Sequence, residues 1–301
     1  VKLKQGYTKN IYSTIEVWLW VVGLFSICLF VNSLCAWLVR RGYLVAGTFL
    51  LMIFFLAVRI TDLEYGWFNN QFNLQIFSPT IFGESFFLPS LGDFLLNVIC
   101  LTWVVLFVYT YKDKYQVPKW LTRSKIAGLA FHLLLLIAFS ALAFLFDQVF
   151  LGLIINSKIN FNITNIINLS LISWVCIIIL CLVWFNVYLV GNIMMEQTLQ
   201  TKVTNKERLV LFLAAFFVYL IYRLTTGFSI FFIAYALFIF IMGWNIYIRN
   251  NKFSIGIFAA LFFCLAFITS IKYLRFTEVK EKSKRHTIAQ KLSSADDPKI
   301  I

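Results

Sequence analysis

The sequence predicts an all-α protein, a polytopic transmembrane helical bundle with about eight spans. Of its 301 residues, 61% are hydrophobic and only 13% are charged, and the mean hydropathy is +0.85. A dissolved protein of this length would have to expose too much of that apolar surface to water. Four prolines and thirteen glycines favour helices. The composition therefore excludes a soluble enzyme, a disordered chain and a disulfide-stapled secreted domain.

Eight apolar segments have roughly the length that crosses a bilayer as a helix, which is about 20 residues. They cover residues 17–38, 43–58, 94–111, 126–146, 166–195, 209–222, 228–248 and 253–271. None contains a proline, which would interrupt a helix. Only residues 223–227 separate the sixth and seventh segments, so one broken helix, and seven spans in all, is the alternative.

The basic residues predict that the amino terminus lies outside, because Lys and Arg collect in cytoplasmic connections. In that orientation the inside connections hold twelve basic residues: Arg40, Arg41, Lys112, Lys114, Lys119, Arg123, Lys125, Lys202, Lys206, Arg208, Arg249 and Lys252. The outside connections hold three, which are Arg59, Lys158 and Arg223. The formal charge of +13 thus reflects topology. No basic cluster with interleaved aromatics lies outside the spans, so we expect no nucleic-acid partner.

Two domains follow from this organisation. Residues 1–275 form the transmembrane module, and residues 276–301 form a polar, basic tail that leads to further domains. Within the module, the outer connections 59–93 and 147–165 are long enough to fold as structured extracytoplasmic loops. Eight spans place the tail outside, whereas its basic charge alone favours seven spans and an inside location. The chain starts at Val1 and stops in a polar segment, so we expect an excerpt of a longer protein.

The cysteines give no sign of a metal or disulfide framework. All six lie in apolar segments, where cysteine behaves as a small apolar residue. No CxxC pair and no Cys/His pair at metal-ligand spacing occurs in the sequence. We predict no metal site and no cofactor.

Ionisable residues in or beside the spans are candidates for chemistry, because such groups are costly in lipid. His132 lies in the fourth segment without a histidine or carboxylate three or four residues later, so we expect a packed helix residue rather than a metal ligand. Arg59 and Arg223 lie at outer span ends, where arginine side chains commonly extend toward lipid headgroups. Scattered Asn and Gly residues, Gly191 among them, favour helix packing over a transport path.

The motif Ser90-Leu91-Gly92-Asp93 precedes the third segment. An intramembrane aspartyl protease would need two membrane aspartates that share a proton. Here a serine stands where that enzyme class has a glycine, and Asp147 comes later, near a span end. We expect instead that Ser90 or Asp93 caps the helix, with Asp93 at the positive end of the helix dipole.

Three blocks of sequence resemble a known family. They are FSP at 77–79 with ESFFLPSLGDFLLN at 84–97, LIINSKINFNI at 153–163, and a tail with EKSKR at 281–285 and DDP at 296–298. These blocks resemble the multi-pass membrane region of Bacteroidetes-type sensor histidine kinases. The resemblance implies a membrane module, a kinase core further downstream and a homodimer. His286 is followed by Thr287-Ile288-Ala289 rather than by an acidic residue and a proline, so this chain has no catalytic residues of its own.

We therefore expect a membrane-embedded sensory or signal-transmitting module of a two-component system, located in the bacterial inner membrane. Its partners would be the lipid bilayer, a second copy and an unknown envelope signal. The alternatives are a small-solute or lipid transporter and an intramembrane enzyme. A ligand, if one binds, is expected at the outer mouth. The candidate residues there are Arg59, Asp62, Glu84, Ser85, Ser90, Asp93, Asp147, Asn156 and Ser157.

Overall fold

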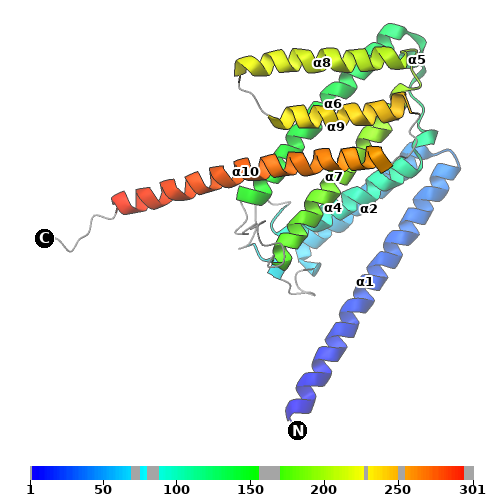
Figure 1. Ribbon diagram of the computed structural model, residues 1–301. Helices are drawn as coiled ribbons and strands as arrows, with labels where there is room; N and C mark the ends of the chain where they lie inside the picture. The colour runs from blue at the N-terminus through cyan, green and yellow to red at the C-terminus, as the bar shows by residue number, and fades with distance from the viewer. Residues whose placement is uncertain are drawn as a thin grey trace. The chain divides into compact units, whose positions relative to one another are not determined.

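Helices make up the regular structure of the chain (Figure 1). The computed structural model describes residues 2–68, 75–79, 88–155, 170–226, 230–249 and 255–294. No β-strand occurs among these residues, so the predicted all-helical fold class is confirmed for them. The chain divides into two compact units, Val1–Tyr115 and Gln116–Ile301, and each is described by itself.

Unit 1 contains three long helices and two short 3-10 turns. These are α1 (Lys2–Arg40), α2 (Leu44–Tyr65), η1 (Gln75–Phe77), α4 (Leu91–Thr110) and η2 (Lys112–Lys114). Gly42 ends α1 with a φ of 95°, a conformation that glycine adopts without strain. The Gly42 amide donates to the Val39 carbonyl and the Tyr43 amide to the Leu38 carbonyl. This Schellman pattern turns the chain sharply into α2.

A small apolar core joins the three long helices of unit 1. It includes Cys35 and Val39 of α1, Leu51 and Phe55 of α2, and Phe107 of α4. Two polar contacts supplement it: the Trp103 indole donates to the Asn32 side chain at 3.2 Å, and the Thr48 and Tyr115 hydroxyls lie 2.7 Å apart. Polar contacts of this kind commonly hold helices together where the surroundings are apolar.

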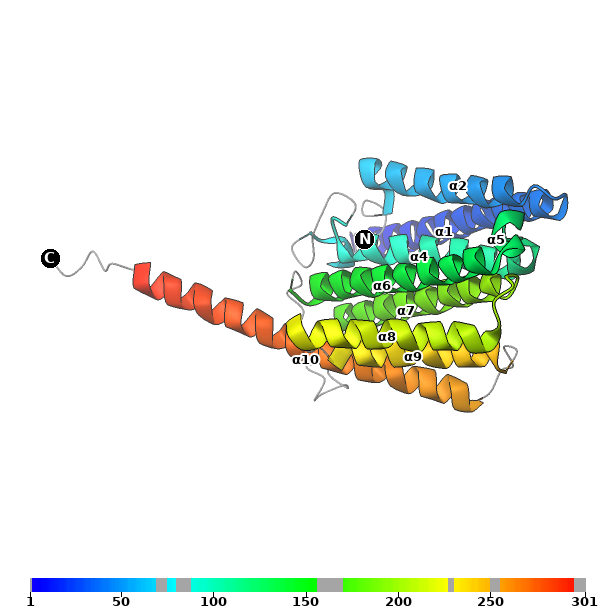
Figure 2. The ribbon, with the colours of Figure 1, turned by 90° about the horizontal axis from the view of Figure 1, so that it is seen from above.

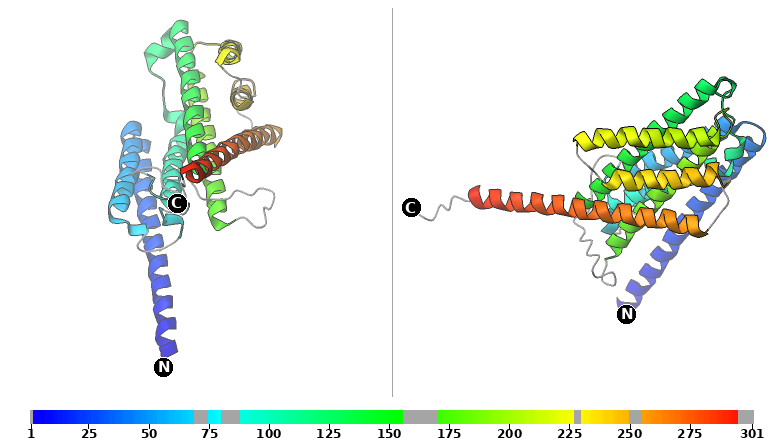
Figure 3. Two further views of the ribbon diagram at one scale, coloured as in Figure 1. Left: turned by 90° about the vertical axis from the view of Figure 1, so that its left-hand side faces the viewer. Right: turned by 45° about the horizontal axis from the view of Figure 1, so that its top comes forward.

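Unit 2 contains the remaining helices. They are α5 (Lys119–Arg123), α6 (Lys125–Ile155), α7 (Leu171–Thr198), α8 (Asn205–Thr226), α9 (Ile230–Tyr247) and α10 (Ile255–Ser294). Helix α9 lies between α8 and α10 and packs against both, and α6 and α7 cross this row (Figure 1, Figure 2). The right-hand panel of Figure 3 shows the same row of three helices, with α10 extending well past its neighbours.

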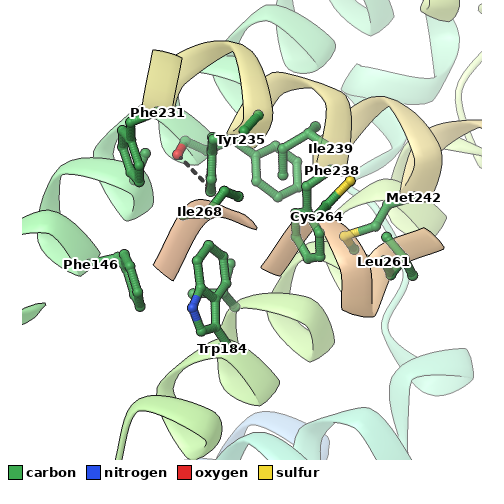
Figure 4. Close-up of a cluster of buried hydrophobic side chains, with 14 of the residues drawn as sticks. Phe146, Trp184, Phe231, Tyr235, Phe238, Ile239, Met242, Leu261, Cys264 and Ile268 are labelled. Carbon is green, nitrogen blue, oxygen red and sulfur yellow. Dashed lines mark hydrogen bonds between the residues drawn. The ribbon is translucent and has the colours of Figure 1, made fainter. Parts of the chain in front are cut away.

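The core of unit 2 is rich in aromatic side chains (Figure 4). Trp184 of α7 contacts Phe146 of α6 and Phe238 of α9. The centroid of its ring lies 4.1 Å from that of Phe146 and 5.6 Å from that of Phe238. Gly191 allows α6 and α9 to approach α7 closely, since a Cβ there would lie 2.9 Å from a Phe139 ring carbon. The expected packing role of this glycine is confirmed.

All eight predicted apolar segments contain a helix of the structure. Within the described residues, six helices are long and apolar enough to cross a membrane: α1, α2, α4, α6, α7 and α10. Helix α9 is apolar but shorter. Helices α8 and α9 lie side by side rather than end to end, so they are two helices and not one broken one. The protein is thus a multi-pass membrane protein.

Several helices continue beyond their predicted apolar segments. Helix α2 was expected to end at residue 58 but runs to Tyr65, and α10 was expected to end at 271 but runs to Ser294. The predicted loop 59–93 therefore begins inside α2. In both helices, charged side chains past the apolar stretch find partners of opposite charge, so the helix can continue. Hydropathy alone does not report such pairs.

Candidate functional site

Two groups of ionisable residues stand out, one in each unit. The Arg59 cluster in unit 1 consists of Arg59, Asp62, Ser90, Asp93 and Asn97. The Lys272 pair in unit 2 consists of Asp147 and Lys272. Ionisable groups in membrane proteins are costly unless they are paired, and for that reason they are the first candidates for function.

Arg59 lies at the centre of its cluster and is buried. One guanidinium nitrogen, Nη1, forms an ion pair with Asp62, one turn later on α2. The second, Nη2, donates to Asp93 Oδ1 of α4 at 3.1 Å, and Nε donates to Asn97 Oδ1 at 2.6 Å. A planar guanidinium donates from three separate nitrogens in three directions, whereas the donors of an ammonium group share one nitrogen. Arg59 therefore links α2 to α4.

Asp93 is held by the start of its own helix as well as by Arg59. Ser90 is the N-cap of α4, and its hydroxyl accepts a hydrogen bond from the Asp93 amide at 3.1 Å. The same hydroxyl donates to Asp93 Oδ2 at 2.5 Å. The predicted cap is confirmed at Ser90, and the carboxylate lies at the positive end of the α4 dipole.

The second acid of the cluster, Asp62, fixes the end of α2. Its Oδ1 accepts from the Phe68 amide at 3.1 Å, just after Gly66 ends the helix with a φ of 63°. Each acid therefore binds Arg59 and also orders a turn of backbone. The cluster connects the end of α2, the start of α4 and the segment after Tyr65.

In unit 2, Asp147 near the end of α6 forms an ion pair with Lys272 of α10. The Lys272 ammonium also lies 4.0 Å from the centre of the Phe231 ring and 5.2 Å from that of Phe276. A cation over an aromatic face is attracted by the negative charge of the ring face. Lys272 is buried, so the pair joins α6 and α10 inside the aromatic core.

The structure brings four of the nine predicted site residues together: Arg59, Asp62, Ser90 and Asp93. Asp147 belongs to the other unit and pairs with Lys272. The other four candidates, which are Glu84, Ser85, Asn156 and Ser157, lie outside the described residues. Binding of a ligand at these positions stays a prediction.

No protein-family model matches the sequence, and no curated protein and no solved structure matches it either. The chain is therefore interpreted from its own geometry. Within the described residues, no group of three or more His, Cys, Asp and Glu side chains could hold a metal ion.

Three outcomes differ from the sequence-based expectations. Arg59 does not extend toward headgroups, because two aspartates bind it inside unit 1. Lys272 lies just past the last predicted apolar segment and was not a candidate, yet it is buried in the core. Arg208 was counted as a residue of an inside connection, yet it is buried too. A signal for Lys272 existed: it directly follows an apolar segment, just as Asp147 does, and the two charges are opposite.

Proposed function

We propose that this chain is the membrane-embedded sensory and signal-transmitting module of a two-component sensor histidine kinase in a bacterial inner membrane. The continuity of α10 carries the proposal. The helix has 40 residues, which span about 60 Å at 1.5 Å per residue. About 20 residues are enough to cross the hydrocarbon core of a bilayer. One helix therefore joins an apolar span to a charged segment of similar length.

The charged half of α10 is stabilised as a helix by its own side chains. Glu278 pairs with Lys282 at 2.8 Å, and Glu281 pairs with Arg285 at 3.3 Å. In both pairs the acid precedes the base by four residues, which is the favourable order for a helix. Because the helix has no break at the boundary, a shift or rotation of the span moves the charged half with it. A receptor needs such an output element.

The Lys272 pair supplies a contact through which the bundle can act on that output. It lies on α10 at the end of the predicted apolar segment and binds α10 to α6. An envelope signal that favours one arrangement of α6 and α10 over another would shift the equilibrium between two states of the module. In this mechanism the pair stabilises one of those states.

The proposal includes the finer topology. All eight long helices cross the membrane, with the amino terminus outside and most basic connections inside. The separate helices α8, with 22 residues, and α9, with 18 residues, support eight spans over seven. The connections after α2 and α6 then form the extracytoplasmic face, and the module works as a homodimer. Eight spans also place the charged half of α10 outside, so the kinase core belongs to a segment further downstream that the chain reaches after one more crossing of the membrane.

The alternative functions have less support. A transporter would need a hydrated polar path, whereas the described hydrophobic core of unit 2 consists of packed aromatic and aliphatic side chains. An aspartyl enzyme would need two carboxylates that share a proton. Asp93 is bound to Arg59 and Asp147 to Lys272, each in its own unit. These contacts favour a signalling module.

The first test is the gene sequence beyond the codon for Ile301. An open reading frame that continues into a histidine-kinase core supports the proposal, and a stop codon at that point contradicts it. This observation needs no knowledge of the signal.

The second test measures autophosphorylation of the full-length protein in membrane vesicles. Asp147→Ala should change the rate by about fivefold or more, the lower end of ordinary coupling between sites. Asp113→Ala is the matched control, since it removes an exposed aspartate of η2 that has no part in the proposed mechanism. Equal rates for the wild type and Asp147→Ala, at equal expression, would contradict the role of α10.

A further inference from the structure

A second buried cation lies in unit 2, at the connection between α7 and α8. Arg208, in the first turn of α8, is only 2% exposed. Around it lie Thr198 and Thr201 at the end of α7, Asn205 at the start of α8, and Tyr247 at the end of α9. Together with His132 of α6 they form the Arg208 cluster. None of these residues takes part in the function proposed above.

The guanidinium group of Arg208 is fixed in place by neutral partners. Its Nη2 donates to the Thr198 carbonyl at 2.7 Å and lies 3.4 Å from the carbonyl and hydroxyl oxygens of Thr201. Its Nη1 donates to the Asn205 side chain. The Tyr247 ring centre is 5.4 Å from Cζ. Carbonyls at the end of a helix carry partial negative charge, but they do not neutralise an arginine.

No carboxylate in the described part of unit 2 forms an ion pair with Arg208. The nearest acid in sequence is Glu207, and both of its oxygens are engaged elsewhere. One binds the Lys125 ammonium at 2.5 Å, and the other accepts from the Thr204 amide at 3.0 Å. A buried charge without a counterion is costly, and arginine does not lose its proton in proteins. The cluster therefore lacks a negative charge.

Within the described residues, three buried nitrogen atoms of the cluster make no hydrogen bond of ordinary geometry. They are Nε of Arg208 and both ring nitrogens of His132. The His132 ring centre lies 6.1 Å from that of Tyr247, the ring that Arg208 also faces. A buried polar atom that makes no hydrogen bond destabilises the folded protein. Arg208 and His132 therefore each have a nitrogen beside the Tyr247 ring that could donate to a ligand.

We infer that the Arg208 cluster binds a phosphate-type oxyanion, either a free phosphate or the phosphate of a phospholipid headgroup with a net negative charge. Such an anion accepts hydrogen bonds from Arg208 Nε and from a His132 N–H, and it supplies the missing negative charge. A water molecule could fill the hydrogen bonds but not the charge. Lys202 and Lys206 in the same connection are exposed, and exposed cations raise the local concentration of anions.

The test uses the full chain, purified in detergent and stripped of lipid. Binding of radiolabelled phosphate and the thermal unfolding midpoint are measured against added phosphate, with chloride at matched ionic strength. In a second arm, the protein is placed in phosphatidylcholine vesicles with or without phosphatidylglycerol. Saturable binding of free phosphate identifies the ion as the ligand. A midpoint that rises only with phosphatidylglycerol identifies the headgroup.

The deciding variant is His132→Phe, which keeps a ring of similar size and removes both unpartnered nitrogens. It should unfold no earlier than the wild type in the absence of phosphate, yet bind phosphate or phosphatidylglycerol at least about tenfold more weakly, which is the loss of one good hydrogen bond. Arg123→Gln, at an exposed cation of α5, should bind like the wild type. Equal binding by His132→Phe, or no saturable binding in either arm, would overturn the inference.

Discussion

Lys272 and Asp147 form an ion pair in which the two partners are buried to different degrees. The Lys272 side chain is 4% exposed, whereas that of Asp147 is 27% exposed. The Asp147 side chain is therefore partly open to the surroundings of the protein, whereas the Lys272 side chain is enclosed. Because the cost of an unpaired charge depends on how far it is removed from water, the two residues of one pair should respond differently to mutation.

Removal of Asp147 should be the more damaging change. Asp147→Ala leaves the Lys272 ammonium buried against Phe231 and should lower the free energy of unfolding by about 3 kcal/mol. Lys272→Met replaces the cation with an apolar chain of similar length and should cost less than about 1.5 kcal/mol. The double variant should resemble Lys272→Met. Unfolding in detergent measures all three, and equal costs for the two single variants would contradict the asymmetry.

Arg59 should not tolerate replacement by lysine. Arg59→Lys keeps the charge but donates from one nitrogen instead of three toward Asp62, Asp93 and Asn97, so the free energy of unfolding should fall by about 2–3 kcal/mol. The control is Arg41→Lys, since Arg41 is exposed and contacts the Trp37 ring at 4.0 Å. That variant should stay within about 0.5 kcal/mol of the wild type. If both variants lowered the free energy of unfolding by similar amounts, the planar guanidinium of Arg59 would have no special role.

The helices of this protein were predictable from local sequence, and so was one of their caps. Apolar length marks a span, and the serine of Ser90-Leu91-Gly92-Asp93 marks a helix start, because both depend on residues that are neighbours in the chain. The ion pairs depend on contacts between residues far apart in sequence. Asp62 and Asp93 were both expected at the outer mouth. Their positions in the sequence did not predict that a single arginine binds both.

The sequence offers a prediction for the side of the membrane on which each charged residue lies, but none for its burial. The number of basic residues in each connection predicts the topology. By this count Arg208 and Lys202 belong to the same inside connection and are not distinguished. In the structure Arg208 is buried and Lys202 is exposed. The difference arises because Arg208 lies on α8, where the carbonyls at the end of α7 bind it, while Lys202 lies in the turn between the helices. Only the packing of helices distinguishes them.

Gly92 should not tolerate replacement by a residue with a side chain. A Cβ at this position would lie 2.6 Å from ring carbons of Phe77, which η1 places against the start of α4. Gly92→Ala should therefore displace the Phe77 ring and lower the free energy of unfolding by about 1–3 kcal/mol. Gly23 of α1 has nothing within 4 Å of such a Cβ, so Gly23→Ala is the control and should not destabilise the protein. The free energy of unfolding of both variants is measured in the same detergent, and equal values would contradict the prediction.

The start of α8 should loosen in acid. Thr204 and Glu207 form a capping box: the Glu207 amide donates to the Thr204 hydroxyl, and the Thr204 amide donates to the Glu207 carboxylate. Lys125, followed by the Thr204 amide, holds the pKa of Glu207 below its ordinary value of 4.5. A depressed pKa in the folded state stabilises the protein above the unfolded pKa, and this stabilisation disappears as the pH falls through the folded pKa.

Hydrogen-exchange protection of the first amides of α8 should therefore be constant from neutral pH down to about pH 5 and should fall at lower pH. Glu207→Gln keeps the capping box, because glutamine also accepts the Thr204 amide, but it cannot titrate or pair with Lys125. Its protection should be lower at neutral pH and independent of acid. If the wild type and Glu207→Gln lost protection in parallel as the pH fell, a carboxylate other than that of Glu207 would control this helix end.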